Sequence, residues 1–175
     1  MKKSYLSGSV IIITLLILIA GCKKENDNDP TINASVVGEW TCTAIDYTGT
    51  TVTEMSGQSL TTDFVGEGYD VDFTLTFTES PNNVTSDGSY SIKLTTTFYG
   101  QSTEQDIEGQ SFSYTGTWSM SGSELSITQG GETSVATIQE LTDSKLSIYI
   151  KDVQTLTNMG ATATTTTEMN VSFTR

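Results

Sequence analysis

The stretch 69-YDVDFTLTF-77 decides the fold class, because apolar and polar residues alternate in it without a break. One set comprises Tyr69, Val71, Phe73, Leu75 and Phe77, and the other comprises Asp70, Asp72, Thr74 and Thr76. Side chains alternate between the two faces of a β-strand. The stretch therefore predicts a strand with one apolar and one polar face.

The same period of two recurs along the chain, at residues 90–98, 112–120, 125–127, 146–150 and 169–173. Short turn sequences at 121–123, 129–131 and 142–144 separate several of these runs, and glycine in two of them suits hairpins. No helical pattern of ten residues occurs outside the leader. The chain is therefore predicted to be all-β and antiparallel, either a closed barrel or a two-sheet β-sandwich. Residues 51–60 and 156–167 fit either a loop or an edge strand.

Three short motifs favour the barrel. Gly38-Glu39-Trp40 opens the first strand, 116-GTWSMSGSELSIT-128 follows later, and 136-ATIQELTDSKLSIYI-150 comes after that. Together they resemble the lipocalin-like domains of bacterial lipoproteins over most of residues 36–175. The resemblance implies an up-and-down barrel of roughly eight or more strands, closed at one end. It also implies a small hydrophobic ligand, although there is no clear carboxy-terminal helix.

Large aromatic side chains are the candidates for the interior. The expected ligand-binding residues are Trp40, Phe73, Phe77, Phe98 and Trp118. With Phe173, so many aromatic rings should fill the closed end, which leaves a modest apolar pocket near the open end, between loops before Tyr69 and after Lys151. In the resembled family a basic residue of the last strand packs on the tryptophan of the Gly-x-Trp motif. Gly38, Trp40 and Arg175 are therefore the expected structural residues, with Arg175 lying across Trp40.

The amino-terminal segment predicts export and lipidation. Two lysines precede the apolar run 10-VIIITLLILIA-20, which is about half the length of a membrane-spanning helix. Ile19-Ala20-Gly21-Cys22 resembles the lipobox of bacterial lipoproteins. We therefore expect a signal peptide over residues 1–21, lipid on Cys22, a flexible tether over 22–35 and the β-barrel domain over 36–175. A basic pair followed by acids after Cys22 resembles a signal that some Gram-negative bacteria use to move lipoproteins to the outer face of the outer membrane, and this resemblance implies an outer-membrane location.

Candidate catalytic and metal sites are few. The absence of histidine excludes Ser-His-Asp and Cys-His catalysis, and no glycine-rich phosphate loop precedes a helix. Asp27 and Asp29 begin a calcium loop that lacks its glycine, while Asp70 and Asp72 alone supply too few oxygen ligands. Cys42 shares a face with Trp40 and is expected to be a small buried side chain. We expect no enzyme, no metal and no cofactor.

The charge of the chain restricts its partners. The formal net charge is -13, and removal of Lys2 and Lys3 with the leader makes it -15. So acidic a chain is not expected to bind nucleic acid. The expected partners are the membrane, through the lipid, and a small hydrophobic ligand, with the protein a monomer. The alternative is a surface protein without internal ligand that meets a glycan or an envelope protein through outward tyrosines, Tyr47, Tyr99 and Tyr149.

Overall fold

The computed structural model describes residues 30–175, and all of its regular structure is β. The expected leader and Cys22 lie outside the described residues. No helix within residues 30–175 has the length and hydropathy of a membrane span. The ten strands are β1 (Thr31–Ile32), β2 (Gly38–Met55), β3 (Gln58–Phe77), β4 (Asn83–Phe98), β5 (Gln101–Ser111), β6 (Tyr114–Ser121), β7 (Glu124–Gln129), β8 (Glu132–Leu141), β9 (Lys145–Asn158) and β10 (Ala161–Thr174).

Eight strands form a closed ring in the order β8-β7-β6-β4-β3-β2-β10-β9, and β9 pairs again with β8. Every pairing within this ring is antiparallel. Closure of a sheet on itself removes its exposed edges. The ring of eight strands agrees with the barrel predicted from the sequence, and the two-sheet sandwich is not observed.

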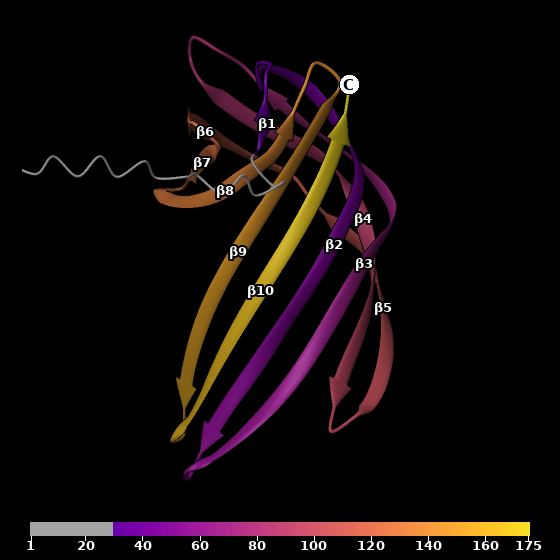
Figure 1. Ribbon diagram of the computed structural model, residues 1–175, viewed down its shortest axis with the longest axis vertical. Coiled ribbons are helices and arrows are strands. Elements are labelled where there is room, and N and C mark those ends of the chain that lie inside the picture. The colour runs from indigo at the N-terminus through magenta and orange to yellow at the C-terminus, as the bar shows by residue number, and fades with distance from the viewer. Residues whose placement is uncertain (1–29) are drawn as a thin grey trace, which may run out of the picture.

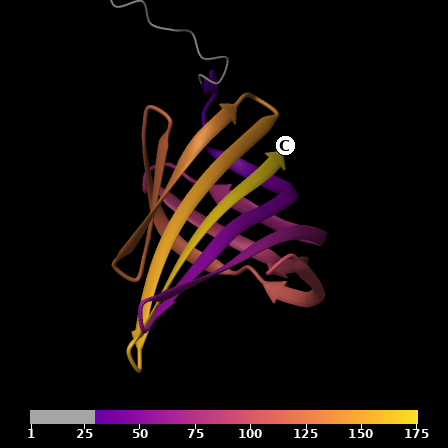
Figure 2. The ribbon, with the colours of Figure 1, turned by 60° about the horizontal axis from the view of Figure 1, so that its bottom comes forward.

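The ring is closed over only part of its height (Figure 1). β4 pairs with β6 through residues 83–86, and β8 pairs with β9 only as far as the pair Thr137 and Tyr149. We name this region the closed end. Below it the sheet continues, open and curved, through β9, β10, β2, β3 and β4, and β5 pairs with β4 at its border. We name this open sheet the extension (Figures 1 and 2). Its strand segments are 151–158, 161–168, 48–55, 58–65, 93–98 and 101–106.

The extension includes both segments that the sequence left ambiguous. Residues 51–60 and 156–167 are strands joined by two-residue turns at Ser56-Gly57 and Met159-Gly160. Each turn has positive φ at both positions, as a tight hairpin of this twist requires. The expected loops before Tyr69 and after Lys151 are therefore wrong, because β3 and β9 run through these positions.

The segment 30–35 also differs from the expected tether. Thr31 and Ile32 form a short strand parallel to the end of β8, and the backbone N–H of Asn33 donates to the carbonyl of Leu141 at 3.0 Å. Val36, which follows, is 1% exposed. The folded part of the chain thus begins before residue 36, because this segment covers the closed end of the ring.

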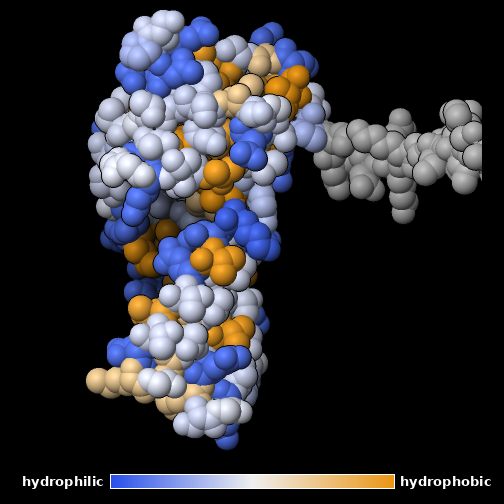
Figure 3. Space-filling model, turned by 90° about the vertical axis from the view of Figure 1, so that its left-hand side faces the viewer, coloured by the Kyte–Doolittle hydropathy of each residue, from blue (hydrophilic) through white to orange (hydrophobic). Residues whose placement is uncertain are grey.

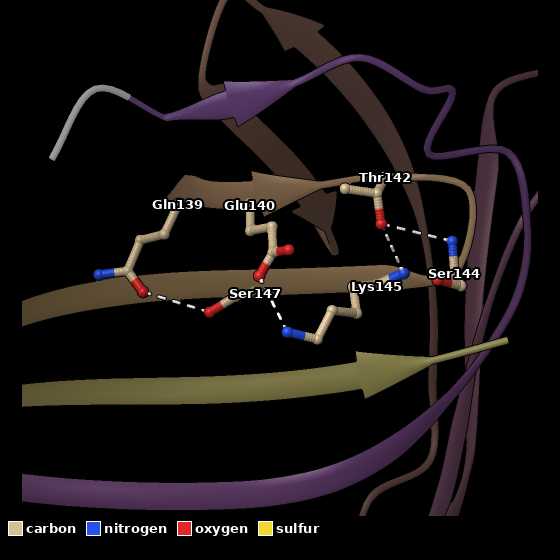
Figure 4. Close-up of polar contacts among 6 residues, drawn as sticks. All are labelled: Gln139, Glu140, Thr142, Ser144, Lys145 and Ser147. Atoms are coloured by element: carbon tan, nitrogen blue, oxygen red, sulfur yellow. Dashed lines mark hydrogen bonds and ion pairs between the residues drawn. The ribbon is translucent and has the colours of Figure 1, made fainter. Parts of the chain in front are cut away.

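The turn between β8 and β9 confirms the predicted turn at residues 142–144 (Figure 4). The hydroxyl of Thr142 accepts hydrogen bonds from the backbone N–H groups of Ser144 at 3.4 Å and Lys145 at 3.0 Å. On the outside of the ring Lys145 pairs with Glu140 at 3.4 Å. Both partners are well exposed to solvent, so this ion pair contributes little to stability.

Candidate functional site: an apolar cavity inside the strand ring

The closed end of the ring is filled by large side chains. Trp40, Phe77 and Ile138 are at most 1% exposed, and the indole N–H of Trp40 donates to the carbonyl of Val36 at 2.7 Å. Trp118 packs edge-on against Phe77, with ring centroids 5.9 Å apart. A fully packed region of this kind has no room for a ligand.

Arg175 covers Trp40, as the family resemblance implied. Its guanidinium carbon lies 4.0 Å from the centroid of the indole ring. The same guanidinium donates to three carbonyl groups, those of Asp143 at 2.8 Å, Val37 at 2.7 Å and Ser35 at 3.2 Å. These contacts join the last strand, the β8–β9 turn and the amino-terminal segment across one tryptophan.

A cavity of about 90 Å³ lies on the other side of this packed layer. Its walls come from β2, β3, β4, β6, β7, β8, β9 and β10, and from residue 112 before β6. Six aromatic side chains line it: Tyr47, Phe73, Tyr90, Phe112, Tyr114 and Phe173. The other lining residues are aliphatic apart from Ser134 and Met169, and no charged side chain of residues 30–175 lines the cavity.

The cavity opens where the two parts of the ring diverge. β8 and β9 separate beyond Thr137 and Tyr149, and the next residues of each strand, Ala136 and Ile150, line the cavity. Val135 beside them is 47% exposed. Figure 3, which faces this side of the molecule, shows apolar side chains within a hollow between the ring and the extension. The mouth is therefore a gap between strands and not a set of loops.

The aromatic side chains hold one another in place. The Phe73 ring lies 4.6 Å from that of Phe112 and 5.9 Å from that of Phe173, in tilted and edge-on arrangements that aromatic pairs prefer. The hydroxyl of Tyr47 donates to that of Tyr90 at 3.1 Å. The tyrosine pair thus satisfies its polar atoms internally and presents its rings to the cavity.

The electrostatic environment of the cavity disfavours charge. Burial raises the pKa of Tyr114 from 10.0 to about 12. Burial, and next the hydrogen bond to Tyr90, raise the pKa of Tyr47 well above its usual range. Burial also raises the pKa of the Cys42 thiol, which belongs to the core but does not line the cavity, from 9.0 to about 12. These groups stay neutral at physiological pH, so the site suits a neutral, apolar ligand group.

Only one of the five predicted ligand-binding residues lines the cavity, and that residue is Phe73. Trp40, Phe77 and Trp118 pack in or against the closed end instead. Phe98 is 41% exposed at the end of β4 in the extension. Alternation assigned Phe98 to the correct face of β4. However, β4 runs beyond the ring at this point, so no strand lies opposite the Phe98 side chain.

Two β-bulges explain why Tyr47 and Tyr69 lie on the opposite faces of their strands from those expected from the sequence. Thr43 is an extra residue of β2, since Cys42 pairs with Phe173 while Ala44 pairs with Ser172. A bulge reverses the faces of all following residues, so Tyr47 points inward although it was expected outside. A second bulge between Tyr69 and Asp72 places Tyr69 on the outer face beside Ser91. Asp70, inside this bulge, has φ of 48°.

Alternation in the sequence could have identified the other cavity-lining aromatic residues as inward-facing. Tyr90, Phe112, Tyr114 and Phe173 each belong to an alternating apolar set in the sequence. Their position at cavity height depends on strand register, which alternation does not provide.

The described residues contain no cluster of candidate metal ligands. Within residues 30–175 no group of three His, Cys, Asp or Glu side chains is placed to hold a metal ion. In the same range every buried side-chain nitrogen and oxygen has a hydrogen-bond partner. Asp70 and Asp72 thus lie at a bulge on the ring without a third ligand.

The comparison with protein families agrees with the fold. Residues 36–148, more than half of the chain, match the family described as "Lipocalin-like domain". No curated protein matches the sequence. Among solved structures, Ail, the attachment invasion locus protein of Yersinia pestis, in complex with the heparin analogue sucrose octasulfate, is 12% identical, with a TM-score of 0.23 over 79% of this chain and 98% of that chain. On the family match, the chain belongs to the lipocalin-like domain family.

Proposed function

We propose that this protein is a lipid-anchored, non-enzymatic binding protein of the bacterial cell envelope that holds an apolar group in the ring cavity. The observation that supports the ligand is the cavity itself, which is lined by aromatic and aliphatic side chains and by no charged one. An apolar cavity stays dry and favours apolar guests. The lipid anchor rests on Ile19-Ala20-Gly21-Cys22 behind a short apolar run.

The size of the cavity restricts the ligand. Sites for drug-sized molecules occupy roughly 300–1,000 Å³, and an apolar cavity of about 150 Å³ accepts benzene. A cavity of about 90 Å³ therefore suits a few carbon atoms, such as the end of a hydrocarbon chain. The gap between β8 and β9 lets the remainder of such a chain leave the ring.

Straight-chain alcohols of increasing length test the proposal by titration calorimetry. Each added methylene should strengthen binding by about 0.8 kcal/mol until the cavity is full, after which the affinity levels off. Ala136→Phe places a ring in the cavity and should abolish binding, because Ala136 is 6% exposed and lines it. Thr137→Phe is the matched control, since Thr137 lies next on β8 with its side chain exposed. The absence of saturable binding at every chain length contradicts the proposal.

The anchor requires a separate measurement. The intact mass of the protein from its host should correspond to a chain that begins at Cys22 and carries acyl chains. Cys22→Ala should yield no acylated product. An unmodified amino terminus in the parent protein contradicts the anchor and leaves the cavity proposal standing.

A further inference from the structure

Among residues 30–175, the extension has two outer edges whose backbone groups have no strand partner on one side. Within this described range β5 pairs only with β4, and residues 150–158 of β9 pair only with β10, because β8 leaves β9 at Tyr149. Figure 1 shows these two strands on opposite borders of the sheet. Free strand edges are templates for pairing with another strand, and soluble proteins usually protect them.

The β5 edge is protected in two ways. Three acidic residues, Glu104, Asp106 and Glu108, occupy it. The register also shifts between Tyr90 and Ile92, where Gly109 takes a φ of 62°. Charges and bulges both hinder the approach of a second strand. This edge is therefore built to face solvent.

The β9 edge has neither protection. The segment 153-VQTLTN-158 contains no charged residue, no proline and no bulge in its pairing with β10. Val153 is 56% exposed and Leu156 is 71% exposed. The two charges that precede it are engaged within the chain: Lys151 pairs with Glu168 at 2.8 Å, and Asp152 accepts a hydrogen bond from Gln154 at 2.8 Å.

We propose that the β9 edge, residues 153–158, pairs in antiparallel register with the same edge of a second copy of this chain. A two-fold axis at Thr155 places Val153 opposite Thr157, Gln154 opposite Leu156 and Asn158 opposite Asp152, so no like charges face each other. A symmetric contact of this kind uses the same patch on both subunits. The backbone N–H and C=O groups left free on this side of β9 then find partners, and the two extensions become one continuous sheet.

The side chains of this edge favour a second copy over an unrelated strand. The outer face of the extension already contains cross-strand threonine pairs, Thr155 with Thr164 at 3.3 Å and Thr157 with Thr162 at 3.2 Å. Pairing at the axis places Thr155 of the second copy beside Thr155 and so extends the Thr155–Thr164 row into the second sheet. Cross-strand threonine pairs stabilise sheets. Such a short edge buries less than the roughly 1,600 Å² of a standard interface, so a weak, reversible dimer is expected.

Cysteine cross-linking tests the register in the purified full chain in detergent. Thr155→Cys should give a disulfide-linked dimer on non-reducing gels under mild oxidation, because the axis brings this position next to its counterpart. Thr103→Cys is the matched control, an exposed threonine on the protected β5 edge of the same sheet. It should cross-link at least ten-fold more slowly. Native Cys42 is buried and should not contribute.

A second variant separates pairing from chance collision. Leu156→Lys adds a charge to an exposed position of the edge and should abolish the Thr155→Cys dimer while the circular dichroism spectrum stays unchanged. Sedimentation velocity of the unmutated chain should show a concentration-dependent dimer. Either equal cross-linking at positions 155 and 103 or a monomer at all concentrations overturns the proposal. The monomer would then agree with the expectation from the sequence.

Discussion

The guanidinium carbon of Arg175, the last residue of the chain, lies 4.0 Å from the centre of the Trp40 ring near the start of the first long strand. The contact between Arg175 and Trp40 joins the first long strand to the last strand of the folded domain. Because the same guanidinium donates to the carbonyls of Ser35, Val37 and Asp143, its loss affects the amino-terminal segment as well as the indole. Arg175 therefore links β10, the β8–β9 turn and the amino-terminal segment at the closed end of the ring.

Arg175→Ala should lower the free energy of unfolding by about 2–4 kcal/mol, from one cation–π contact and three hydrogen bonds. A double-mutant cycle with Trp40→Phe isolates the contact with the ring, and the expected coupling is about 0.5–2 kcal/mol. Urea unfolding measures each corner of the cycle. Arg175→Lys is the control, since it keeps the charge but loses the planar fork of donors. Strictly additive losses contradict a direct contact between the two side chains.

Gly38 leaves the space that Arg175 occupies. A Cβ atom at this position would lie 2.8 Å from an Arg175 guanidinium nitrogen, and φ is 130°. Gly38→Ala should therefore cost more than Gly122→Ala, where φ is 59° and nothing lies within 4 Å, so that only a backbone cost of about 1–2 kcal/mol applies. In an Arg175→Ala background this excess should shrink. If both glycines respond equally in both backgrounds, the steric argument is wrong.

The Cys42 thiol should be inert in the folded protein. It is 3% exposed, and burial raises its pKa to about 12, so almost no thiolate exists at pH 8. A chromogenic disulfide reagent should label it only after urea is added, at the rate of global unfolding. Exposed Thr41→Cys, one residue earlier, is the positive control and should react within minutes. Rapid labelling of the folded parent protein contradicts the buried position.

The protein should lose stability in alkali. Cys42 and Tyr114 have pKa values of about 12 when folded, against 9.0 and 10.0 ordinarily. The folded state therefore binds more protons than the unfolded state above pH 9, so stability falls as the pH rises from 9 to 12. The slope is at most about 1.4 kcal/mol per pH unit for each group. Urea midpoints from pH 7 to 12 measure it.

Two substitutions assign this alkaline loss to particular groups. Cys42→Ala should delay its onset from near pH 9 to near pH 10, and Tyr114→Phe should reduce the slope above pH 10. A stability that is flat to pH 12 in the parent protein contradicts the proposed burial of both groups.

Alternation along single strands was sufficient to predict the fold class. Strands such as 69–77 predicted β structure with one apolar face, and the motif at Gly38-Glu39-Trp40 predicted the Arg175 contact correctly. These features depend on neighbours in sequence or on the family resemblance. Of the aromatic residues expected to fill the closed end, Trp40, Phe77 and Trp118 pack there, whereas Phe73 and Phe173 line the cavity and Phe98 is exposed.

The position of the cavity was decided by the tertiary structure. A single extra residue at Thr43 turns Tyr47 inward, and the bulge after Tyr69 turns that residue out. A sequence pattern does not reveal such a bulge, because the pairing partners on β10 and β4 define it. Pairing with neighbouring strands also determines strand length. β3 and β9 continue through the segments before Tyr69 and after Lys151, which were expected to be loops.

By itself, the sequence determined an all-β chain with alternating strands, and with the family resemblance it placed a packed tryptophan at one end of the domain. The tertiary structure decided which aromatic residues line the cavity and which strand edge is left without protection. The physical reason is that alternation assigns a residue to a face, whereas register and closure determine what lies opposite that face. Phe73 and Phe98 follow the same alternation, yet one meets a wall of aromatic rings and the other is 41% exposed.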